Sequence, residues 1–394
     1  MQCKRSAAVF AAPTLLLALA CAPAAPAAAG ERPISAELGG RLHLDFAEFH
    51  NDSRGRPNRD GTEVRRAWLD VSGNLYSLRY KVEGDFSHPK DIVARDVFLS
   101  HRFGQAGTLT VGQFKQPFSL DDRTGSNYGS FLERGSGAGT LAPLYRLGAG
   151  WLAAADGRTF AASAYSVQSI DVTAAKGYGL ASRATWSAPR AGADVLHLGL
   201  SLAHEHHDRP GAPGRPGVKI RPRPAGHLSD NSRMTLADFS AGRDTDVDKW
   251  SLEYAAVRGP LSWQAEWSGA RLRDGLQHGQ VQAAYALLSW FVSGESRHYD
   301  PKSGRFTRIA DIAHALGAVE LAVRYDTLWG SQRLDGGPAL RDGRTEAFTL
   351  GANWYLRPNL RLMLNLIQSR NRDDLSGHTL DRTRAVTGRF QYDF

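Results

Sequence analysis

The sequence predicts an all-β protein: a transmembrane, antiparallel, up-and-down β-barrel of about 16 strands. Apolar and polar residues alternate from about residue 35 to the end of the chain, as in strands with one apolar and one polar face. No run of about 18 apolar residues follows residue 29, so no membrane-spanning helix is predicted. The last residues, 388–394, carry aromatic side chains at every second position up to Phe394. A membrane protein without spanning helices must satisfy its backbone hydrogen bonds in a closed barrel.

Residues 1–29 have the order of a secretory signal peptide. Lys4 and Arg5 precede an apolar stretch, and small residues follow up to Ala29, after which we expect cleavage. Cys21 suggests a lipoprotein, but the residue three places before it is not Leu, so we favour cleavage after Ala29. Both cysteines, Cys3 and Cys21, lie in this segment, so no disulfide or thiolate chemistry is expected in the mature chain. Because the segment has two basic and no acidic residues, its removal lowers the formal net charge from +8 to +6.

Sixteen segments show the alternating pattern, and an even number suits an up-and-down barrel. The strands are expected at residues 35–49, 62–73, 75–87, 92–102, 106–116, 143–154, 158–167, 177–188, 193–205, 247–258, 260–272, 278–298, 314–329, 342–357, 359–372 and 381–394. Tyr and Trp residues near strand ends, as at Trp329, Trp354 and Tyr355, are expected to form the interfacial aromatic girdle.

The lengths of the connections support the same topology. Short connections follow even-numbered strands and most longer ones follow odd-numbered strands, as expected for periplasmic turns and outer loops; the segment 299–313 is an exception. Two connections are long: the Gly- and Ser-rich residues 117–142, and residues 206–246, which are rich in Pro, Gly and basic residues and are expected to form a mobile extracellular loop. No linker interrupts residues 30–394, so we expect a single barrel domain.

A set of short segments, in order over nearly the whole mature chain, carries a family resemblance. The segments are Arg65-Arg66, residues 111–120 (VGQFKQPFSL), 131–134 (FLER), 223–224 (RP) with 227–228 (HL), 259–266 (GPLSWQAE), 293–297 (SGESR) and 353–363 (NWYLRPNLRLM). As a set they resemble the family of phosphate-selective porins O and P.

The resemblance implies a sixteen-stranded, trimeric porin of the Gram-negative outer membrane, through which small anions such as phosphate or polyphosphate diffuse passively. It implies that the loop over residues 117–142 folds into the lumen and constricts it. By position, Arg65 and Arg66 correspond to paired lumen arginines, and Arg134 to the arginine of the inserted loop. Lys115 corresponds to the basic residue after Gly-Gln-Phe.

At one position the chain departs from the family. Where many relatives carry a basic residue on the inserted loop, this chain has Asn127. The resemblance therefore implies anion passage without assigning phosphate as the preferred anion. The ending at Phe394 resembles the signal that the barrel-assembly machinery reads. The expected partners are thus small anions, outer-membrane lipid, other copies of the chain and this machinery, with no nucleic acid.

Basic residues on the polar faces of strands are candidates for a series of anion sites. These candidates are Arg79, Lys81, Arg324, Arg361 and Arg389. Successive weak sites suit conduction because one tight site would trap the anion. Arginine can bind a phosphate or carboxylate through two bonds. Carboxylates share these faces and could pair with the basic residues instead; they are Glu83, Asp85, Glu266 and Glu320.

Regular alternation cannot place both Arg65 and Arg66 in the lumen. Arg66 shares a face with Trp68 and Asp70, whereas Arg65 shares a face with apolar neighbours. Either a β-bulge redirects one of them, or Arg65 lies near the membrane interface. Arg66 is the stronger candidate.

Two other segments contain residue types that are typical of metal, nucleophile or phosphate sites. The string His204-Glu205-His206-His207-Asp208 has metal-ligand residue types but lacks the helical zinc-protease spacing, so we expect an exposed strand end. Residues 135–139 lack the spacing of a nucleophile elbow or a phosphate loop. We therefore expect no metal, no cofactor and no enzymatic activity. Two alternatives stay open: a general or cation-preferring porin, and an outer-membrane barrel enzyme such as a phospholipase, for which no Ser–His spacing is evident.

Overall fold

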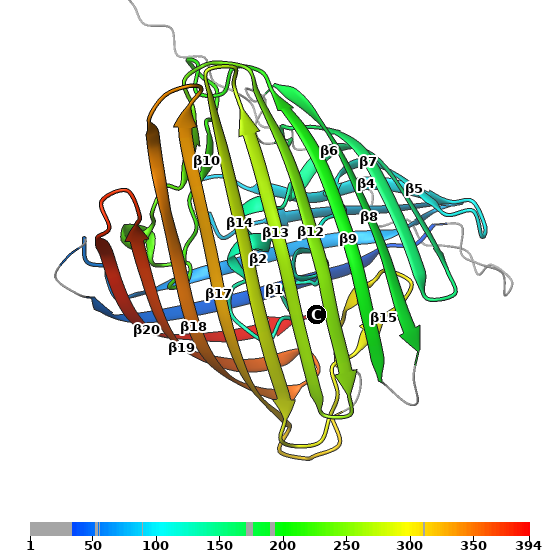
Figure 1. Cartoon of the computed structure of the whole chain (residues 1–394). Helices are drawn as coiled ribbons and strands as arrows, with labels where there is room; N and C mark the ends of the chain where they lie inside the picture. Colours follow the sequence, from blue (N-terminus) through cyan, green and yellow to red (C-terminus); the bar gives the residue numbers. More distant parts are fainter. Residues whose placement is uncertain are drawn as a thin grey trace, which may run out of the picture.

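The computed structural model describes residues 34–394 except 52–53, 55, 89, 171–175, 190–193 and 310–311. The expected signal peptide, residues 1–29, lies outside the described residues. The main body is a closed antiparallel barrel in which each strand pairs with its neighbours in chain order, and β20 pairs with β1 (Figure 1). The barrel strands are β1 (Glu37–Asn51), β2 (Gly61–Leu75), β3 (Leu78–Asp85), β4 (Val93–Arg102), β5 (Thr108–Lys115), β6 (Tyr145–Ala155), β7 (Arg158–Ser166), β8 (Gly177–Pro189), β9 (Val195–His207), β12 (Thr245–Arg258), β13 (Leu261–Arg273), β14 (Gln277–Phe291), β17 (Ala318–Leu334), β18 (Ala339–Arg357), β19 (Leu360–Asp373) and β20 (Thr379–Asp393).

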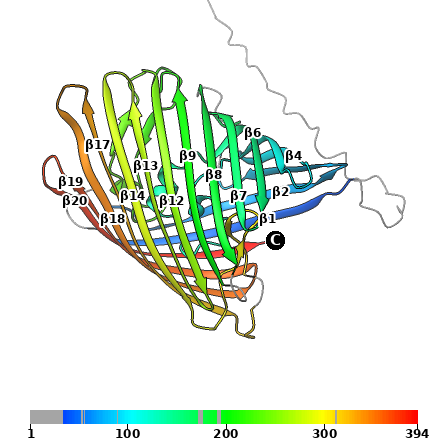
Figure 2. The same cartoon turned by 45° about the vertical axis from the view of Figure 1, so that its right-hand side comes forward.

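The predicted barrel of sixteen strands is confirmed. Figure 2 shows the strands running around one continuous wall, with the long strands β12, β13, β14, β17 and β18 next to one another. The predicted strand over residues 278–298 was too long, because β14 ends at Phe291 and the chain then turns at Gly294, whose φ is +99°. Glycine adopts this left-handed conformation without the steric cost that a side chain would bring.

The alternation places apolar side chains outside the barrel and polar side chains inside it. On β19, Leu362, Leu364 and Leu366 are exposed on the outside, whereas Arg361 and Asn365 are buried on the inside. An outward apolar band of this kind is the lipid-facing surface of a membrane barrel. Among the helices that the described residues form, none has the length and apolar character needed to cross a membrane.

Two of the three residues expected in the aromatic girdle face outward. Trp329 and Trp354 are exposed on the outer face, but Tyr355 is buried and donates a hydrogen bond to Glu320 at 2.7 Å. Successive side chains of a strand point to opposite faces, so Trp354 and Tyr355 cannot both face the membrane.

Three connections carry small elements into the interior of the barrel. The inserted loop (residues 116–144) holds α1 (Leu120–Arg123) and α2 (Ser136–Leu141), and the long loop (residues 208–244) holds β10 (Val218–Ile220), the 3₁₀ turn Asp230–Ser232 and β11 (Ala237–Phe239). The turn-end connection (residues 292–309 and 312–317) lies at the end of the barrel where the short hairpin turns are, and it holds β15 (Tyr299–Asp300) and β16 (Arg305–Phe306). The inserted loop confirms the predicted lumen loop.

From its composition we expected the long loop to be mobile, but in the structure it is packed against the wall of the barrel. Its side chains Ile220, Leu236 and Phe239 are buried in one cluster with inward residues of the wall, including Leu272 and Leu328. Because these apolar residues are scattered among Pro, Gly and basic residues, the sequence pattern of the loop concealed their common packing. Burial of this kind stabilises the loop in the mouth of the barrel by roughly 1.5–3 kcal/mol for each large apolar side chain.

The turn-end connection enters the barrel from the opposite end. The Tyr299 hydroxyl lies 2.6 Å from the His197 ring, and Arg183 donates a hydrogen bond to the Gly304 carbonyl at 2.7 Å. Phe306 is buried in one cluster with Leu120 of the inserted loop. The interior is therefore narrowed by segments that come from both ends of the barrel.

Candidate functional site

Two buried carboxylates fix the inserted loop to the wall. Glu266 on β13 accepts hydrogen bonds from the Ser119 hydroxyl at 2.6 Å and from the Asp121 amide at 2.7 Å. Glu320 on β17 accepts one from the Ser130 hydroxyl at 2.6 Å. These two wall carboxylates therefore anchor the loop instead of neutralising the lumen arginines.

Three of the predicted arginines hold the same loop. Each donates a hydrogen bond to a loop carbonyl: Arg361 to Gly129 at 2.9 Å, Arg389 to Leu132 at 2.7 Å and Arg324 to Glu133 at 2.9 Å. Arg361 and Arg389 are each only 2% exposed. The structure therefore corrects their predicted place on an open anion ladder, because their donors are used against the loop. Arg324 also lies 4.6 Å from the ring centre of Phe131.

An open cavity remains along strands β1 to β6, on the side away from these anchors. Its volume is about 830 Å³, and it extends from Arg79 and Thr110 near the turn end to Arg221 and Arg233 of the long loop. The described residues that line it include twelve arginines and two lysines, against three acidic residues. The predicted site residues among them are Arg65, Arg66, Arg79, Lys81, Lys115 and Arg134. The lining is thus strongly cationic over the length of the cavity.

A β-bulge brings both Arg65 and Arg66 to the cavity. Between β1 and β2, His43 pairs with Arg66 but Leu44 pairs with Val64, so Arg65 is the extra residue. A bulge of this kind redirects a side chain that regular alternation would place outside. Of the two alternatives left open by the sequence, the structure therefore has the bulge.

Glu133 of the inserted loop lies among these arginines. Arg65 donates two hydrogen bonds to its carboxylate, at 2.9 and 3.0 Å, and Arg389 donates a third at 3.1 Å. Burial would raise the pKa of Glu133, but the charges of Arg65 and Arg66 outweigh burial and hold the pKa well below its ordinary value. Glu133 is therefore ionised at neutral pH and offsets part of the positive charge beside the cavity.

The other predicted cations differ in how far carboxylates neutralise them. Lys81 lies 2.7 Å from Glu83, and Lys115 lies 2.8 Å from Asp122. The Arg79 side chain forms no hydrogen bond or ion pair with any residue that the structure describes. A permeating anion would therefore meet neutralised and free cations in turn.

The Arg134 side chain both holds the inserted loop and faces the lumen. Its guanidinium donates hydrogen bonds to the carbonyls of Asp121 at 2.8 Å and Thr124 at 2.9 Å, around the carboxyl end of α1. The same side chain lines the cavity and the two narrower pockets beside it. Replacing it would change both the loop and the charge of the lumen.

Several lumen arginines were missed in the sequence, or recognised only as part of a family segment. They are Arg41, Arg95, Arg123, Arg146, Arg221, Arg223, Arg233 and Arg305. Arg41 and Arg95 lie over the ring of Trp68, at 4.5 and 5.0 Å from its centre. Arg41 could have been found, because it alternates with His43 and Asp45 on the polar face of the first strand.

The arginines in connections had no comparable periodic signal. Arg123 lies in α1, next to the turn-end connection and its Arg305. Burial, and after it the charges of Arg305 and Arg183, lower the pKa of Arg123 to about 10, so it stays cationic at neutral pH. Only the folding of two distant segments toward each other brings these charges together.

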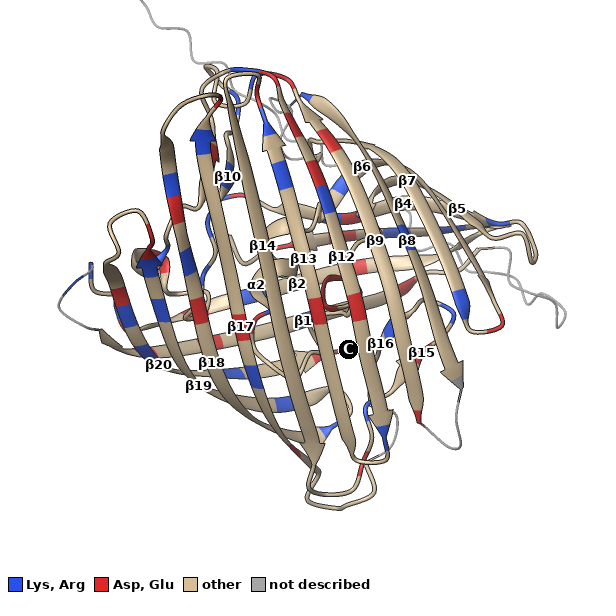
Figure 3. Ribbon diagram, viewed as in Figure 1, with Lys and Arg blue, Asp and Glu red and all other residues tan. Residues whose placement is uncertain are grey.

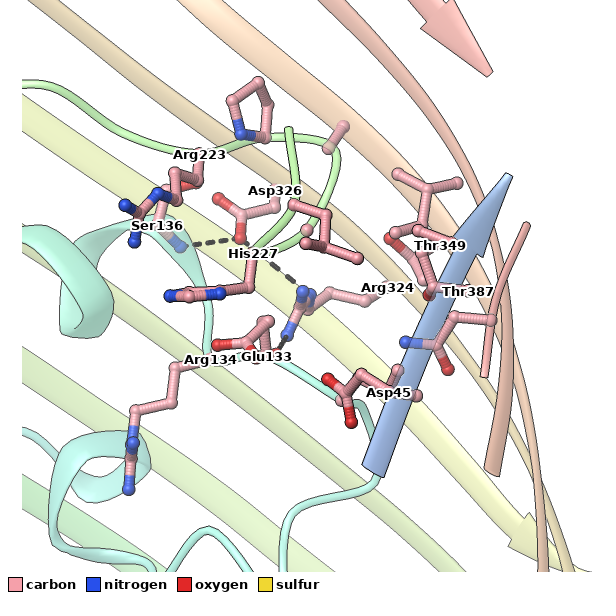
Figure 4. A pocket seen from close by; sticks show the side chains of 18 of the residues that line it. Asp45, Glu133, Arg134, Ser136, Arg223, His227, Arg324, Asp326, Thr349 and Thr387 are labelled. Carbon is pink, nitrogen blue, oxygen red and sulfur yellow. Dashed lines mark hydrogen bonds and ion pairs between the residues drawn. The ribbon is translucent and has the colours of Figure 1, made fainter. Parts of the chain in front are cut away.

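The loop end of the site is built from the long loop and the inserted loop. Figure 4 shows Arg223 and His227 of the long loop facing Arg324 and Asp326 of the wall across a narrow pocket. The Ser136 amide donates to Asp326 at 2.7 Å, which fixes the start of α2 there. The pocket continues the lining of the cavity on its wall side.

Three further residues that the sequence singled out do not line the cavity. Asn127 is buried and lies 3.0 Å from the His43 ring, so its side chain faces the wall. His204 and His206 face outward and each bonds to an aspartate, at 2.9 and 2.8 Å. Over the residues described, no group of three or more His, Cys, Asp or Glu side chains could hold a metal ion.

The comparisons with known proteins agree on one family and one fold. The sequence model of the family described as phosphate-selective porin O and P matches residues 36–394. Porin O of Pseudomonas aeruginosa is 26% identical over 396 residues, covering 92% of this chain and 89% of that protein. An uncharacterised protein of Caulobacter vibrioides is 28% identical over 358 residues, covering 85% of this chain and 68% of that protein.

Solved structures share the barrel at low sequence identity. The anion-selective porin from Comamonas acidovorans is 13% identical with a TM-score of 0.57, covering 91% of this chain and 99% of that one. OmpT, an outer-membrane protein of Vibrio cholerae in its trimer form, is 14% identical with a TM-score of 0.55 over the same shares. At these identities the likeness shows the fold alone.

Proposed function

The chain belongs to the family of phosphate-selective porins O and P and is an outer-membrane porin, and from this premise we propose that it lets small anions diffuse passively through the cavity beside the inserted loop. The anions would include phosphate and other phosphorylated or carboxylated solutes. The site residues are Arg65, Arg66, Arg79, Lys81, Lys115 and Arg134, with the arginines of the connections added to them.

One observation supports the anion preference above the others: the imbalance of charge along the lining, with fourteen basic against three acidic residues. Two unit charges about 4 Å apart attract by roughly 4 kcal/mol at an effective dielectric near 20, against about 1 kcal/mol in bulk water. A narrow lumen lies between these limits, so a row of arginines lowers the energy of an anion and raises that of a cation.

The spread of the charges supports transport rather than storage. Arg221 and Arg233 lie in the long loop, Arg65 and Arg66 in the loop-end half of β2, and Arg79 at the turn end of β3. An anion that enters from the long loop would therefore meet them in this order. Because carboxylates accompany part of the row, as Glu133 does Arg65, no single position needs to hold the anion tightly. Weak successive sites are what conduction requires.

The alternatives carry different requirements. A cation-preferring porin would need acidic residues to dominate the lining, and Glu266 and Glu320 are occupied with the inserted loop. We take the protein to be a channel and not an enzyme.

We also propose a homotrimer in contact with outer-membrane lipid, which the trimer form of the Vibrio cholerae structure supports by its fold.

The C-terminus is proposed to serve assembly. Phe394 exchanges two backbone hydrogen bonds with Gly40 of β1, both at 3.0 Å, and its ring is exposed. A Cβ on Gly40 would lie 2.6 Å from this ring, so glycine leaves the space that the aromatic side chain occupies. An exposed terminal aromatic residue supports recognition by the barrel-assembly machinery.

Planar-bilayer recordings test the proposal. Under a potassium chloride gradient we expect a reversal potential with the sign of anion selectivity, and a second recording with phosphate in place of chloride measures the preference between the anions. A reversal potential of the opposite sign would refute anion preference. A folded barrel that conducts no current in either salt would refute the channel.

A further inference from the structure

Three arginines on the outer faces of β19 and β20 lie near the hairpin that joins these strands. Figure 3 shows basic positions in blue and acidic positions in red close together at this hairpin. Arg370 on β19 is directly opposite Arg382 on β20, and Arg384 follows two residues later on the same outer face. Arg382 and Arg384 are exposed, and none of the three forms an ion pair within the described part of the chain. We call Arg370, Arg382 and Arg384 the outer arginine patch.

The protein does not neutralise this patch itself. Like charges directly opposite each other on two strands are destabilising. The nearby Asp374 is engaged by Arg344 and Arg372, both at 3.0 Å. The Nε atom of Arg370 is buried and has no hydrogen-bond partner among the residues described, although its Nη2 donates to Thr379 at 3.2 Å.

One more carboxylate lies on the other side of Arg370. Glu346 of β18 is directly opposite Arg370, but it forms no ion pair with that arginine and accepts a hydrogen bond from the Tyr325 hydroxyl at 3.2 Å. On β1, His50 is opposite Arg384 and lies 3.7 Å from Glu48. The arginines thus outnumber the carboxylates that are free to balance them.

Strands β9, β12 and β13 have a different arrangement of outward charges near their loop ends. There His206 of β9 is opposite Asp246 of β12, which is in turn opposite Arg273 of β13. In the next row Asp248 is opposite Arg271. Cross-strand neighbours alternate in sign on these strands, so opposed like charges are not a general property of this rim.

The patch lies where the apolar outer face ends. The outward residues of β19 are leucines from Leu360 to Leu366, and Gln368 and Arg370 follow toward the loops. Ten residues of a strand span roughly 34 Å, which at a tilt of about 40° is roughly 26 Å of height. This matches the height of about 25 Å of the apolar band of outer-membrane barrels. Arg370 is therefore at the level of the lipid headgroups on the loop side.

We propose that the outer arginine patch binds the phosphate groups of the phosphorylated glycolipid in the outer leaflet, with its acyl chains along the leucine face of β19. Arginine forms two parallel, charge-assisted hydrogen bonds to a phosphate, and an anion between Arg370 and Arg382 would relieve their repulsion. A free phosphate ion would meet an open surface without apolar contact. The lipid meets both the charges and the leucines.

The test compares thermal unfolding of the purified, delipidated barrel in neutral detergent with and without bisphosphorylated lipid A. For the wild type we expect lipid A to raise the unfolding temperature, and dephosphorylated lipid A and inorganic phosphate to leave it unchanged. The triple variant Arg370→Gln, Arg382→Gln, Arg384→Gln should lose this gain, with an affinity for lipid A lower by roughly tenfold or more. The matched control Arg271→Gln, which removes an arginine opposite Asp248, should keep it.

The stability of the triple variant without lipid separates the proposal from a purely structural role of the three arginines. In neutral detergent alone the triple variant should be as stable as the wild type or more stable, because the repulsion between Arg370 and Arg382 is gone. The proposal is overturned if the triple variant keeps the response to lipid A, or if inorganic phosphate stabilises the wild type equally. Dissociation of the oligomer of the triple variant without any change in the lipid response would also overturn it and identify the face as a contact between copies. Anion conductance does not enter these readouts.

Discussion

Replacing Glu133 by Gln is the most direct perturbation of the proposed anion path. The substitution keeps the shape of the side chain but removes the one acidic group of the inserted loop that lines the cavity. In the wild type this carboxylate accepts two hydrogen bonds from Arg65 and one from Arg389. Glu133→Gln therefore leaves about one additional unit of positive charge next to Arg65.

The size of the effect follows from Coulomb's law. One unit charge about 4 Å from the anion changes its energy by roughly 1 kcal/mol in water and roughly 4 kcal/mol at an effective dielectric near 20. The dissociation constant of an anion at this position should fall by roughly fivefold to several hundredfold, with the water-filled cavity favouring the low end. The charge-assisted bonds of Arg65 become ordinary ones, which should lower the free energy of unfolding by about 1–3 kcal/mol.

The assay is a set of single-channel recordings over a range of phosphate concentrations. Anion selectivity should increase, while the current at saturating phosphate should decrease because a more tightly held anion leaves more slowly. Asp335→Asn is a matched control, since Asp335 is exposed at the loop end and bonds to His278 at 2.6 Å, away from the cavity. If Glu133→Gln and Asp335→Asn give the same selectivity and saturation current, anions do not pass Arg65 and the reasoning is refuted.

Three further outcomes are expected. Arg134→Ala should reduce the reversal potential for anions more than Arg209→Ala, because Arg134 lines the cavity whereas the Arg209 side chain is 60% exposed beside Asp208; equal effects in bilayer recordings would contradict the placement of the inserted loop. Glu266→Gln should lower the free energy of unfolding by about 1–3 kcal/mol and raise single-channel conductance, because an NH2 group replaces one of the two oxygens that accept hydrogen bonds from the loop; thermal unfolding and conductance measure the two effects. Because the pKa of Glu133 is depressed, its stabilising contribution is present above the unfolded-state pKa and is lost only as pH falls through the folded-state pKa, so the selectivity difference between wild type and Glu133→Gln should persist down to about pH 5. A difference that disappears at that pH in recordings would contradict this ionisation state.

The sequence was informative wherever the signal is local. Alternation with a period of two follows from strand geometry, so it predicted the sixteen strands and the inward side of Arg66, Lys81 and Arg361. Alternation does not indicate which part of the protein an inward side chain faces across the lumen. Arg79 faces the open cavity and Arg361 faces the inserted loop, although both satisfy the same pattern.

Strand ends and connections were harder to predict for a related reason. The packing of Ile220 and Phe239, and the inward packing of Tyr299 and Phe306 in the turn-end connection, depend on contacts with wall residues far away in the sequence. Composition identified the Pro- and Gly-rich segment of the long loop but not the few apolar residues that fold it inward. The bulge at Arg65 depends on the register with β1, which no single strand specifies.

By itself, therefore, the sequence determined the fold class, the number of strands and the faces of most side chains, because these depend on backbone geometry over neighbouring residues. Only the tertiary structure decided which cations are free. Glu266 and Glu320 hold the inserted loop, while Glu83 and Asp122 neutralise Lys81 and Lys115, and this division depends on where the loop lies within the barrel. Charge in a lumen acts over a few ångströms, so its effect is set by distances between segments that the linear order of the chain does not contain.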